Sequence, residues 1–236
     1  MTLDAAMGAS TLMMGLAFIQ QSLEHMRPAA RPAERLLFAP RLLLSMLLVA
    51  SQLGAPLPVL WLLAGLLINH LAILHFFAGP YNGGCDRMSL LILLCLTAAY
   101  AMPQYRELAF GYLGAQLTLS YFISGWVKVV NPAWRNGRAL NDVFRFSAYP
   151  AGENIRGWAQ HPRLLLAMGW AVMLFELAFP LSLATRPTLI LALIIAATFH
   201  GANACLFGLN RFFWIWLCAY PSILWLQERV VFPLLP

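Results

Sequence analysis

Charge is scarce in this chain. Only 10% of its 236 residues are charged, and Asp and Glu together number nine, whereas a soluble domain has about 25% charged residues. So few charges exclude an ordinary soluble domain, which needs polar groups over most of its surface. Hydrophobic residues make up 61% of the chain and the mean hydropathy is +0.72. Apolar runs occur throughout residues 1–236, so the sequence predicts a single integral membrane domain in contact with the lipid bilayer.

Motifs that would name a reaction are also missing. The four cysteines form no CxxC pair and show no zinc or haem spacing. The sequence has no nucleophile elbow and no phosphate loop, and its histidines lack the HxxxH or ExxH spacing of a metal site. We therefore expect no metal. Residues 1–26 lack a basic region before their apolar stretch, so no cleavable signal peptide is expected.

Eight apolar runs approach the roughly 20 residues that a membrane-spanning helix needs. The first run ends in polar residues at Gln20, Gln21 and Glu24, so it either crosses the membrane or lies in the interface. The predicted fold is an all-α polytopic membrane helix bundle with seven or eight spans. The runs are 5–25, 36–53, 58–78, 88–102, 108–130, 164–185, 188–208 and 212–226. Pro58, Pro103, Pro162, Pro187 and Pro221 are expected at or near helix ends.

The basic residues predict which side of the membrane each loop faces. The formal net charge is +6, but positive charge between membrane spans is explained by the positive-inside rule, so no nucleic-acid partner is expected. With eight spans, eleven arginines and one lysine fall on one side and three arginines on the other. The larger set is Arg27, Arg31, Arg35, Arg41, Arg87, Lys128, Arg135, Arg138, Arg145, Arg156, Arg163 and Arg211. The sequence therefore predicts a multi-pass protein of the cell (inner) membrane with cytoplasmic arginine-rich loops.

The long loop 131–162 is predicted to be amphipathic, partly helical and interfacial. Its aromatic residues alternate with arginines, a pattern typical of a segment that lies on anionic lipid. Arg138 and Asp142 are four residues apart and could pair on a short helix. The aromatic residues expected to contact the membrane surface are Phe144, Phe146, Tyr149 and Trp158.

Two ionisable residues stand out within the apolar runs. Lys128 lies at the end of run 108–130, between Gly125 and Trp134, and Glu176 lies near the middle of run 164–185. Charges at membrane depth are costly, so they usually have a function. Lys128 is either a base that lines a cavity or a lysine that extends its amine to the headgroups. Glu176 must face the protein interior and needs a polar partner, for which His200, Asn203, His70 and Lys128 are the candidates.

Further polar residues could complete a pocket. His200 and Asn203 are three apart on one helix face, and a second run carries His70 beside Asn69. Each histidine is either a satisfied packing residue or part of a shared polar cavity. The turn that contains Asn82 and Asp86 has two interpretations as well. Asp86 caps the helix that follows, or the turn lines the mouth of the pocket together with Trp134 and Gly137.

Three stretches together resemble the HTTM family, the membrane domain shared by vitamin K-dependent gamma-carboxylases and many bacterial proteins. The likeness covers about residues 35–225. The central stretch has the pattern Gly-x-x-Lys-(x)5-Trp-x-x-Gly. The three stretches are residues 81–88 (YNGGCDRM), 121–140 (YFISGWVKVVNPAWRNGRAL) and 199–221 (FHGANACLFGLNRFFWIWLCAYP).

The resemblance implies a membrane fold with a pocket for a quinone-like molecule or a lipid. In the carboxylases a lysine in the matching stretch is regarded as the base that acts on a hydroquinone, and by position this role falls on Lys128. Residues 101–104 contain no histidine where the carboxylases use one, so peptide carboxylation is not inferred.

Three functions are therefore open. The first is an HTTM-like enzyme or enzyme subunit that acts on a quinone-like, lipid or peptide substrate, with Lys128, Glu176 and His200 as catalytic residues. Asn203, Trp134, Gly137, Asp86, Asn82 and His70 would bind the substrate. The second is a non-catalytic membrane subunit that anchors a membrane or peptide partner through its arginine-rich loop. The third is a DoxX-like bundle that binds quinone without converting it.

Overall fold

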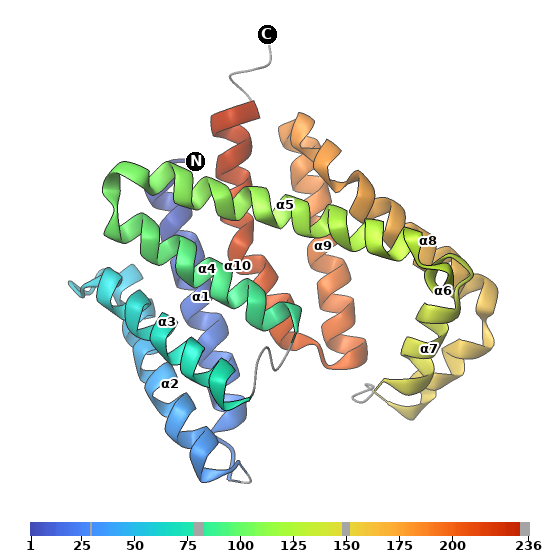
Figure 1. Ribbon diagram of the computed structural model, residues 1–236, viewed down its shortest axis with the longest axis horizontal. Helices are drawn as coiled ribbons and strands as arrows, with labels where there is room; N and C mark the ends of the chain where they lie inside the picture. Colours follow the sequence, from blue (N-terminus) through green and yellow to red (C-terminus); the bar gives the residue numbers. More distant parts are fainter. Residues whose placement is uncertain (29, 78–82, 148–151, 232–236) are drawn as a thin grey trace. The chain divides into compact units, whose positions relative to one another are not determined.

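The computed structural model describes residues 1–28, 30–77, 83–147 and 152–231 (Figure 1). All regular structure in this part of the chain is helical. The chain divides into two compact units, and α5 (Arg106–Val130) and α10 (Asn210–Leu226) each contribute to both. Of the described residues, the first unit comprises those within 1–114 and 214–231. The second unit comprises residues 115–213.

The first unit contains four consecutive helices and the C-terminal helix. Consecutive helices pack against one another, α1 on α2, α2 on α3 and α3 on α4. Gly15 allows a close approach of α1 and α2, because a Cβ there would lie 2.7 Å from Val49 Cγ2. The helices are α1 (Leu3–His25), α2 (Pro32–Gln52), α3 (Val59–Phe76) and α4 (Gly84–Ala101), followed by the 3-10 turn η1 (Pro103–Tyr105). The π-helical turn η4 (Gln227–Val231) follows α10.

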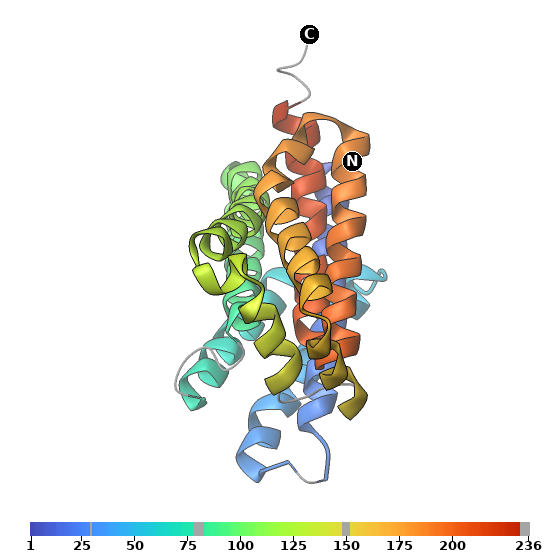
Figure 2. The same ribbon diagram turned by 90° about the vertical axis from the view of Figure 1, so that its right-hand side faces the viewer.

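The second unit contains the end of α5, three short helical segments and two long helices. Figure 2 shows α8 (Pro162–Ala178) and α9 (Arg186–Phe207) as antiparallel helices on either side of η3 (Phe179–Ala184). Thr185 and Thr188 form a capping box at the start of α9, which satisfies two early backbone N–H groups. The short segments are α6 (Pro132–Arg135), α7 (Arg138–Phe146) and η2 (Glu153–Gln160).

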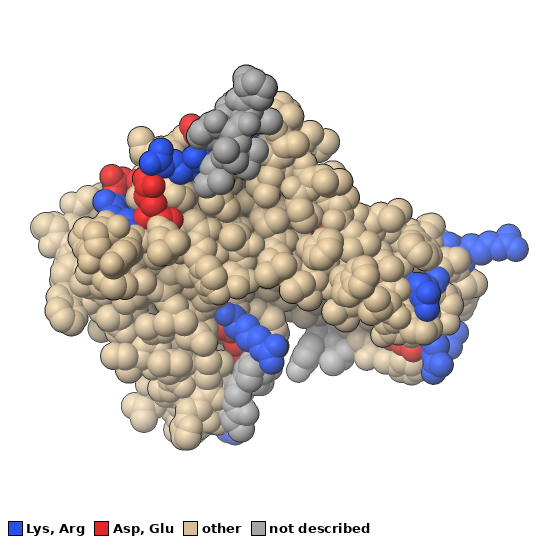
Figure 3. All heavy atoms as spheres, turned by 45° about the horizontal axis from the view of Figure 1, so that its top comes forward, with Lys and Arg blue, Asp and Glu red and all other residues tan. Residues whose placement is uncertain are grey.

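The membrane character of the chain is evident in both units. Five helices are long and apolar enough to cross a membrane by length and composition: α1, α3, α4, α8 with η3, and α9. The first apolar run is among them. Helices also form over the other three predicted runs, but that these helices cross the membrane remains a prediction. Figure 3 shows charged side chains in small groups, separated by broad uncharged areas on the face that it draws.

Segment 131–162 is partly helical, as predicted. Arg138 Nε lies 3.6 Å from Asp142 Oδ2, so the predicted pair forms on α7. The prediction that Phe144 contacts the membrane surface is wrong. Its side chain is 1% exposed and packs with Ile155, Leu165 and Phe207 in a buried cluster. This follows from helix geometry, since Leu140 and Phe144 share the inner face of α7.

Phe146, the last residue of α7, lies two residues after Phe144. It is outside the buried cluster and is 75% exposed. Trp158 is 42% exposed and stacks on Phe144, with ring centroids 5.6 Å apart. Tyr149 falls outside the described residues. The two exposed aromatic side chains keep the segment suitable for contact with an interface.

Two further expectations are corrected in the first unit. Pro221 lies inside α10 rather than near its end. Asp86 does not cap α4, because the capping position is Gly83, and Asp86 lies buried within the first turn. Gly83 has a positive φ of 49°, a backbone conformation that glycine adopts at little cost.

The first turn of α2 contains an acidic residue, Glu34, with two basic neighbours. Arg31 Nε donates to Glu34 Oε1 over 2.6 Å, and His25 Nδ1 lies 3.1 Å from Glu34 Oε2. The hydrogen bond from Arg31, followed by the one with His25, lowers the pKa of Glu34 below its ordinary value. The carboxylate of Glu34 therefore helps to join the end of α1 to the start of α2.

Candidate functional site

An ion pair between α5 and α8 is the centre of the candidate site. Lys128 Nζ donates to both carboxylate oxygens of Glu176, over 2.7 Å and 2.6 Å. The side chains of Lys128 and Glu176 are 17% and 5% exposed. Glu176 thus faces the protein interior and has Lys128 as its polar partner, one of the candidates predicted from the sequence. Two opposite charges in such close contact largely neutralise each other.

Gly125 allows the two helices to meet at this pair. A Cβ on Gly125 would lie 2.8 Å from Leu177 N and 2.9 Å from Glu176 Cβ, closer than such atoms can approach. Any larger residue would therefore have to move α8 away from α5. Because Gly125 precedes Lys128 by one helical turn, both face α8. Small residues commonly allow this kind of close contact between membrane helices.

A cavity of about 630 Å³ opens beside the ion pair, and Lys128 lies in its wall. The volume is within the usual range of small-molecule sites, which are mostly apolar with a few polar groups. Residues of α5, α6, α7, α8 and α9 contribute to the wall, all from the second unit. They are Lys128, Trp134, Ala139, Leu140, Asp142, Val143, Phe146, Ser147, Gly169, Val172, Phe199, Asn203, Phe207 and Leu209.

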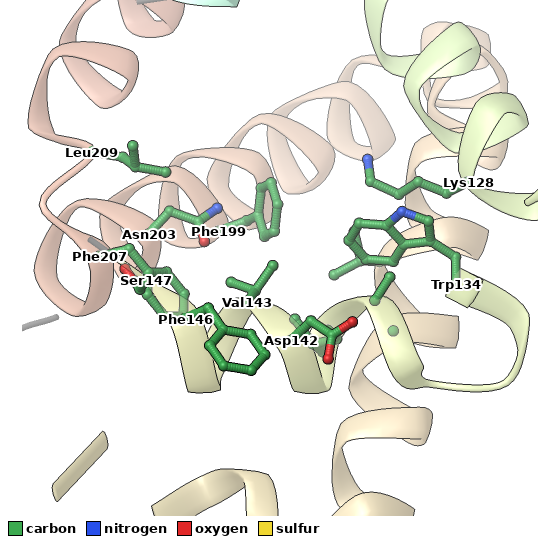
Figure 4. A pocket seen from close by; sticks show the side chains of 14 residues that line it. Lys128, Trp134, Asp142, Val143, Phe146, Ser147, Phe199, Asn203, Phe207 and Leu209 are labelled. Atoms are coloured by element: carbon green, nitrogen blue, oxygen red, sulfur yellow. The ribbon is translucent and has the colours of Figure 1, made fainter. Parts of the chain in front are cut away.

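The polar groups of the cavity lie on different sides. Figure 4 shows Lys128 and Trp134 on one side and Asn203 with Ser147 on the other. Apolar side chains, including Phe199, lie between them. A molecule that fills this space would therefore contact a cation at one end and an amide at the other.

Trp134 is held beside Lys128 by the short helix α6. Asn131 starts this helix, since its side chain accepts a hydrogen bond from Ala133 N. Lys128 Nζ lies 5.5 Å from the centre of the Trp134 ring, a distance at which an aromatic face attracts a cation. Trp170 Nε1 donates to Arg135 O over 3.2 Å, which ties α6 to α8.

Gly137 and His200 support the site without lining the cavity. Gly137 has φ 81° and starts α7, and a Cβ there would lie 3.3 Å from Leu166 Cα. His200 is 3% exposed, and its Nε2 lies 2.8 Å from the Tyr121 hydroxyl, within hydrogen-bond distance. Asn203, one turn further along α9, is the member of this pair that reaches the cavity wall.

The other predicted site residues belong to the first unit. His70 Nε2 lies 2.9 Å from Asp86 O, and its Nδ1 lies 2.5 Å from Arg41 Nη2. The charge pattern assigns Arg41 to the arginine-rich loops, and this prediction is wrong, because Arg41 lies within α2 with an exposure of 0%. Its Nη1 donates to Gln21 Oε1 over 2.7 Å. Asn82 is outside the described residues.

Several cavity residues were not identified from the sequence. Phe199 and Phe207 are two of them; each lies four residues from the predicted Asn203, which places all three on one face of α9. Gly169 and Glu176 are seven apart and share a face of α8 in the same way. The sequence contains this spacing, but a helix that is apolar all round has residues at the same intervals on every face. The spacing alone therefore does not show which face lines a cavity. In the part of the chain that the structure describes, no group of three His, Cys, Asp or Glu side chains could hold a metal ion.

The helices and the site define a helical membrane protein with a buried ion pair whose lysine lines an apolar cavity. A family model for the HTTM domain matches residues 95–227, which is more than half of the chain. The protein therefore belongs to the HTTM family, and the predicted resemblance is confirmed. The match includes every residue of the cavity wall. No curated protein and no solved structure matches the chain significantly.

Proposed function

We propose that this HTTM protein is a membrane enzyme, or the catalytic subunit of one, in which Lys128 removes a proton from a substrate bound in the cavity. The substrate would be quinone-like, namely a hydroquinone. A lipid and a peptide are the two alternative classes of substrate. The observation that carries the proposal is that Lys128, which is paired with Glu176, lines the 630 Å³ cavity.

A base must be neutral before it accepts a proton, and the pair offers a route to that state. Both Glu176 oxygens lie within 2.7 Å of Lys128 Nζ, so a proton can pass from the ammonium to the carboxylate. Two neutral groups cost less to bury than two charges in an apolar wall. The amine that results holds a lone pair and can take the proton of a substrate hydroxyl, while Glu176 keeps the first proton.

The surroundings favour an apolar substrate with an acidic hydroxyl group. Trp134 and Phe199 are part of the cavity wall and present aromatic faces to a flat ring. His200 and Tyr121 do not line the cavity. Their hydrogen bond would hold α9 in position, and neither residue would contact the substrate. We assign His200 a positioning role in the proposed reaction.

The experiment uses 2-methyl-1,4-naphthohydroquinone as the probe, with the protein in lipid nanodiscs and oxygen as the oxidant. Deprotonation of the hydroquinone speeds its two-electron oxidation to the quinone, with oxygen reduced to hydrogen peroxide. General base catalysis typically gives about 10²- to 10⁴-fold. We expect the protein to accelerate oxidation, and Lys128→Met to reduce the rate to that of empty nanodiscs.

Arg229→Met is the matched control. Arg229 Nε lies 3.2 Å from Glu107 Oε2 on the surface of the first unit, so this change also removes the cation of an ion pair. We expect full activity in this variant. Equal rates for Lys128→Met and the wild type would refute the proposed role of Lys128.

The non-catalytic anchor is the second candidate, and one observation favours it. Arg135, Arg138 and Arg145 are exposed on α6 and α7, and the ring of Phe146 on α7 is exposed as well. Such a surface suits a membrane partner or the anionic cytoplasmic leaflet. Under this function, substitution of these arginines would abolish complex formation, whereas Lys128→Met would leave it intact.

A further inference from the structure

The width of the cavity depends on Gly169. This residue is buried and lines the cavity on α8, and a Cβ added there would meet no atom within 4 Å. Gly125, on the facing helix, would meet backbone atoms within 3 Å. The two glycines therefore act in opposite ways, since Gly125 allows helices to touch and Gly169 leaves space for something that is not protein.

The charges around the cavity cancel in pairs. Lys128 is bound by both oxygens of Glu176, and Asp142 pairs with Arg138 at 3.6 Å. A charged ligand would have to break one of these pairs or remain uncompensated in an apolar wall, and an unpaired buried charge is costly. The charge balance therefore favours an uncharged ligand over a fatty acid or an anionic headgroup.

Asn203 offers a hydrogen bond on the side of the cavity away from Lys128 (Figure 4). Its side chain is half-buried among Phe199, Phe207 and other apolar residues of the wall. An amide in apolar surroundings is stabilised when a partner satisfies its donor or acceptor groups. A polar group on the ligand would supply that partner, and the aromatic walls suit flat rings.

We propose that the cavity binds an uncharged ring compound that occupies the space over Gly169 and forms a hydrogen bond with Asn203, so that Gly169 determines which molecules fit. This inference rests on the same cavity as the proposed function and names the residues that select its ligand. It depends on the shape and charge of the wall and not on proton transfer by Lys128.

Two fluorescent probes with one skeleton test the proposal. N-phenyl-1-naphthylamine is uncharged and carries an N–H group, and 8-anilino-1-naphthalenesulfonate has the same rings with an added sulfonate. Saturable binding to amphipol-trapped protein is measured for each, after subtraction of the linear partition into amphipol. We expect one saturable site for the uncharged probe and at least tenfold weaker binding of the sulfonate.

Substitutions locate the site. We expect Gly169→Leu to weaken binding of the uncharged probe at least tenfold, because the new side chain occupies the space over residue 169. Asn203→Leu should weaken it about fivefold through the lost hydrogen bond. Gly157→Leu is the matched control, since a Cβ on Gly157 also meets no atom within 4 Å but the residue is outside the cavity wall. It should bind as the wild type does.

Gly169→Ala covers the case in which the leucine variant fails to fold, and it should weaken binding about threefold. Equal affinity for the two probes, or unchanged affinity in both Gly169 variants, would overturn the inference. The hydroquinone assay reports separately. If the Gly169 variants bind the probe unchanged while hydroquinone oxidation still depends on Lys128, only the ligand assignment is refuted. If the Gly169 variants bind the probe more weakly while the wild type does not accelerate hydroquinone oxidation, only the role of Lys128 as a base is refuted.

Discussion

Replacement of Gly125 by alanine tests whether close contact between α5 and α8 maintains the ion pair. The new Cβ would lie 2.8 Å from Leu177 N and 2.9 Å from Glu176 Cβ. Backbone cannot rotate away as a side chain can, so the helices must separate by several tenths of an ångström at least. We expect this separation to lengthen the contact between Lys128 Nζ and Glu176.

The expected magnitude follows from two opposing effects. Overpacking of a tight contact costs about 1–3 kcal/mol, and alanine in place of glycine within a helix contributes about 0.5–1 kcal/mol of stability. The net destabilisation from Gly125→Ala is therefore about 0–2.5 kcal/mol, with a central value of about 1.2 kcal/mol. For a chain of this length, 1 kcal/mol changes Tm by about 2–4 °C, so the central value corresponds to a fall in Tm of roughly 2–5 °C.

Gly169→Ala is the matched control, since it makes the same change on the facing helix α8. A Cβ at Gly169 meets no atom within 4 Å, so only the gain in helix propensity remains and Tm should rise by roughly 1–4 °C. Thermal unfolding in detergent, followed by tryptophan fluorescence, measures both variants.

The reactivity of Lys128 gives a second measurement. Lys128 is the only lysine in the chain, so mass spectrometry after treatment with an apolar amine-reactive ester reports on this side chain and the N-terminus alone. We expect faster modification in Gly125→Ala than in Gly169→Ala, because a looser pair releases the amine. If the two variants have the same Tm and the same modification rate, close packing at Gly125 does not control the pair.

Three further predictions concern stability and topology. Removal of one partner from a buried pair leaves the other charge uncompensated, so Lys128→Met and Glu176→Leu should each lower Tm more than the double variant does; a double-mutant cycle with additive effects would contradict this. The pKa of Glu34 is lower in the folded state than its ordinary value of 4.5. The ionised carboxylate therefore stabilises the fold fully at pH values above 4.5, and this contribution is lost as the pH falls through the lower pKa of the folded state. The difference in Tm between the wild type and Glu34→Gln should therefore be larger at pH 7 than at pH 3, and an equal difference at both would show that the charge has no role. In a cysteine-free chain, Asn136→Cys should react with an impermeant maleimide only after cells are opened, while Gln104→Cys reacts in intact cells; the reverse pattern would place the arginine-rich loop outside.

Composition and periodicity determined the class of this protein. Scarce charge and long apolar runs predicted a helical membrane protein, and the run 88–102 became helix α4 (Gly84–Ala101). Glu176 was predicted to be buried and partnered because an isolated carboxyl group in an apolar span is costly. These inferences succeed because hydrophobicity and helical spacing are local properties of a sequence. The HTTM resemblance was visible for the same reason, in contiguous motifs.

The tertiary structure decided which side chains meet. Four partners for Glu176 were consistent with the sequence, and the contact of α5 with α8 at Gly125 selected Lys128. Arg41 was assigned to a loop by its charge, but bonds to Gln21 and His70 hold it inside the first unit. The space over Gly169 was also unforeseen, because a glycine in a helix can mark either contact or emptiness. Only the positions of the neighbouring helices distinguish these two cases, since a sequence lists side chains but does not show the distances between them.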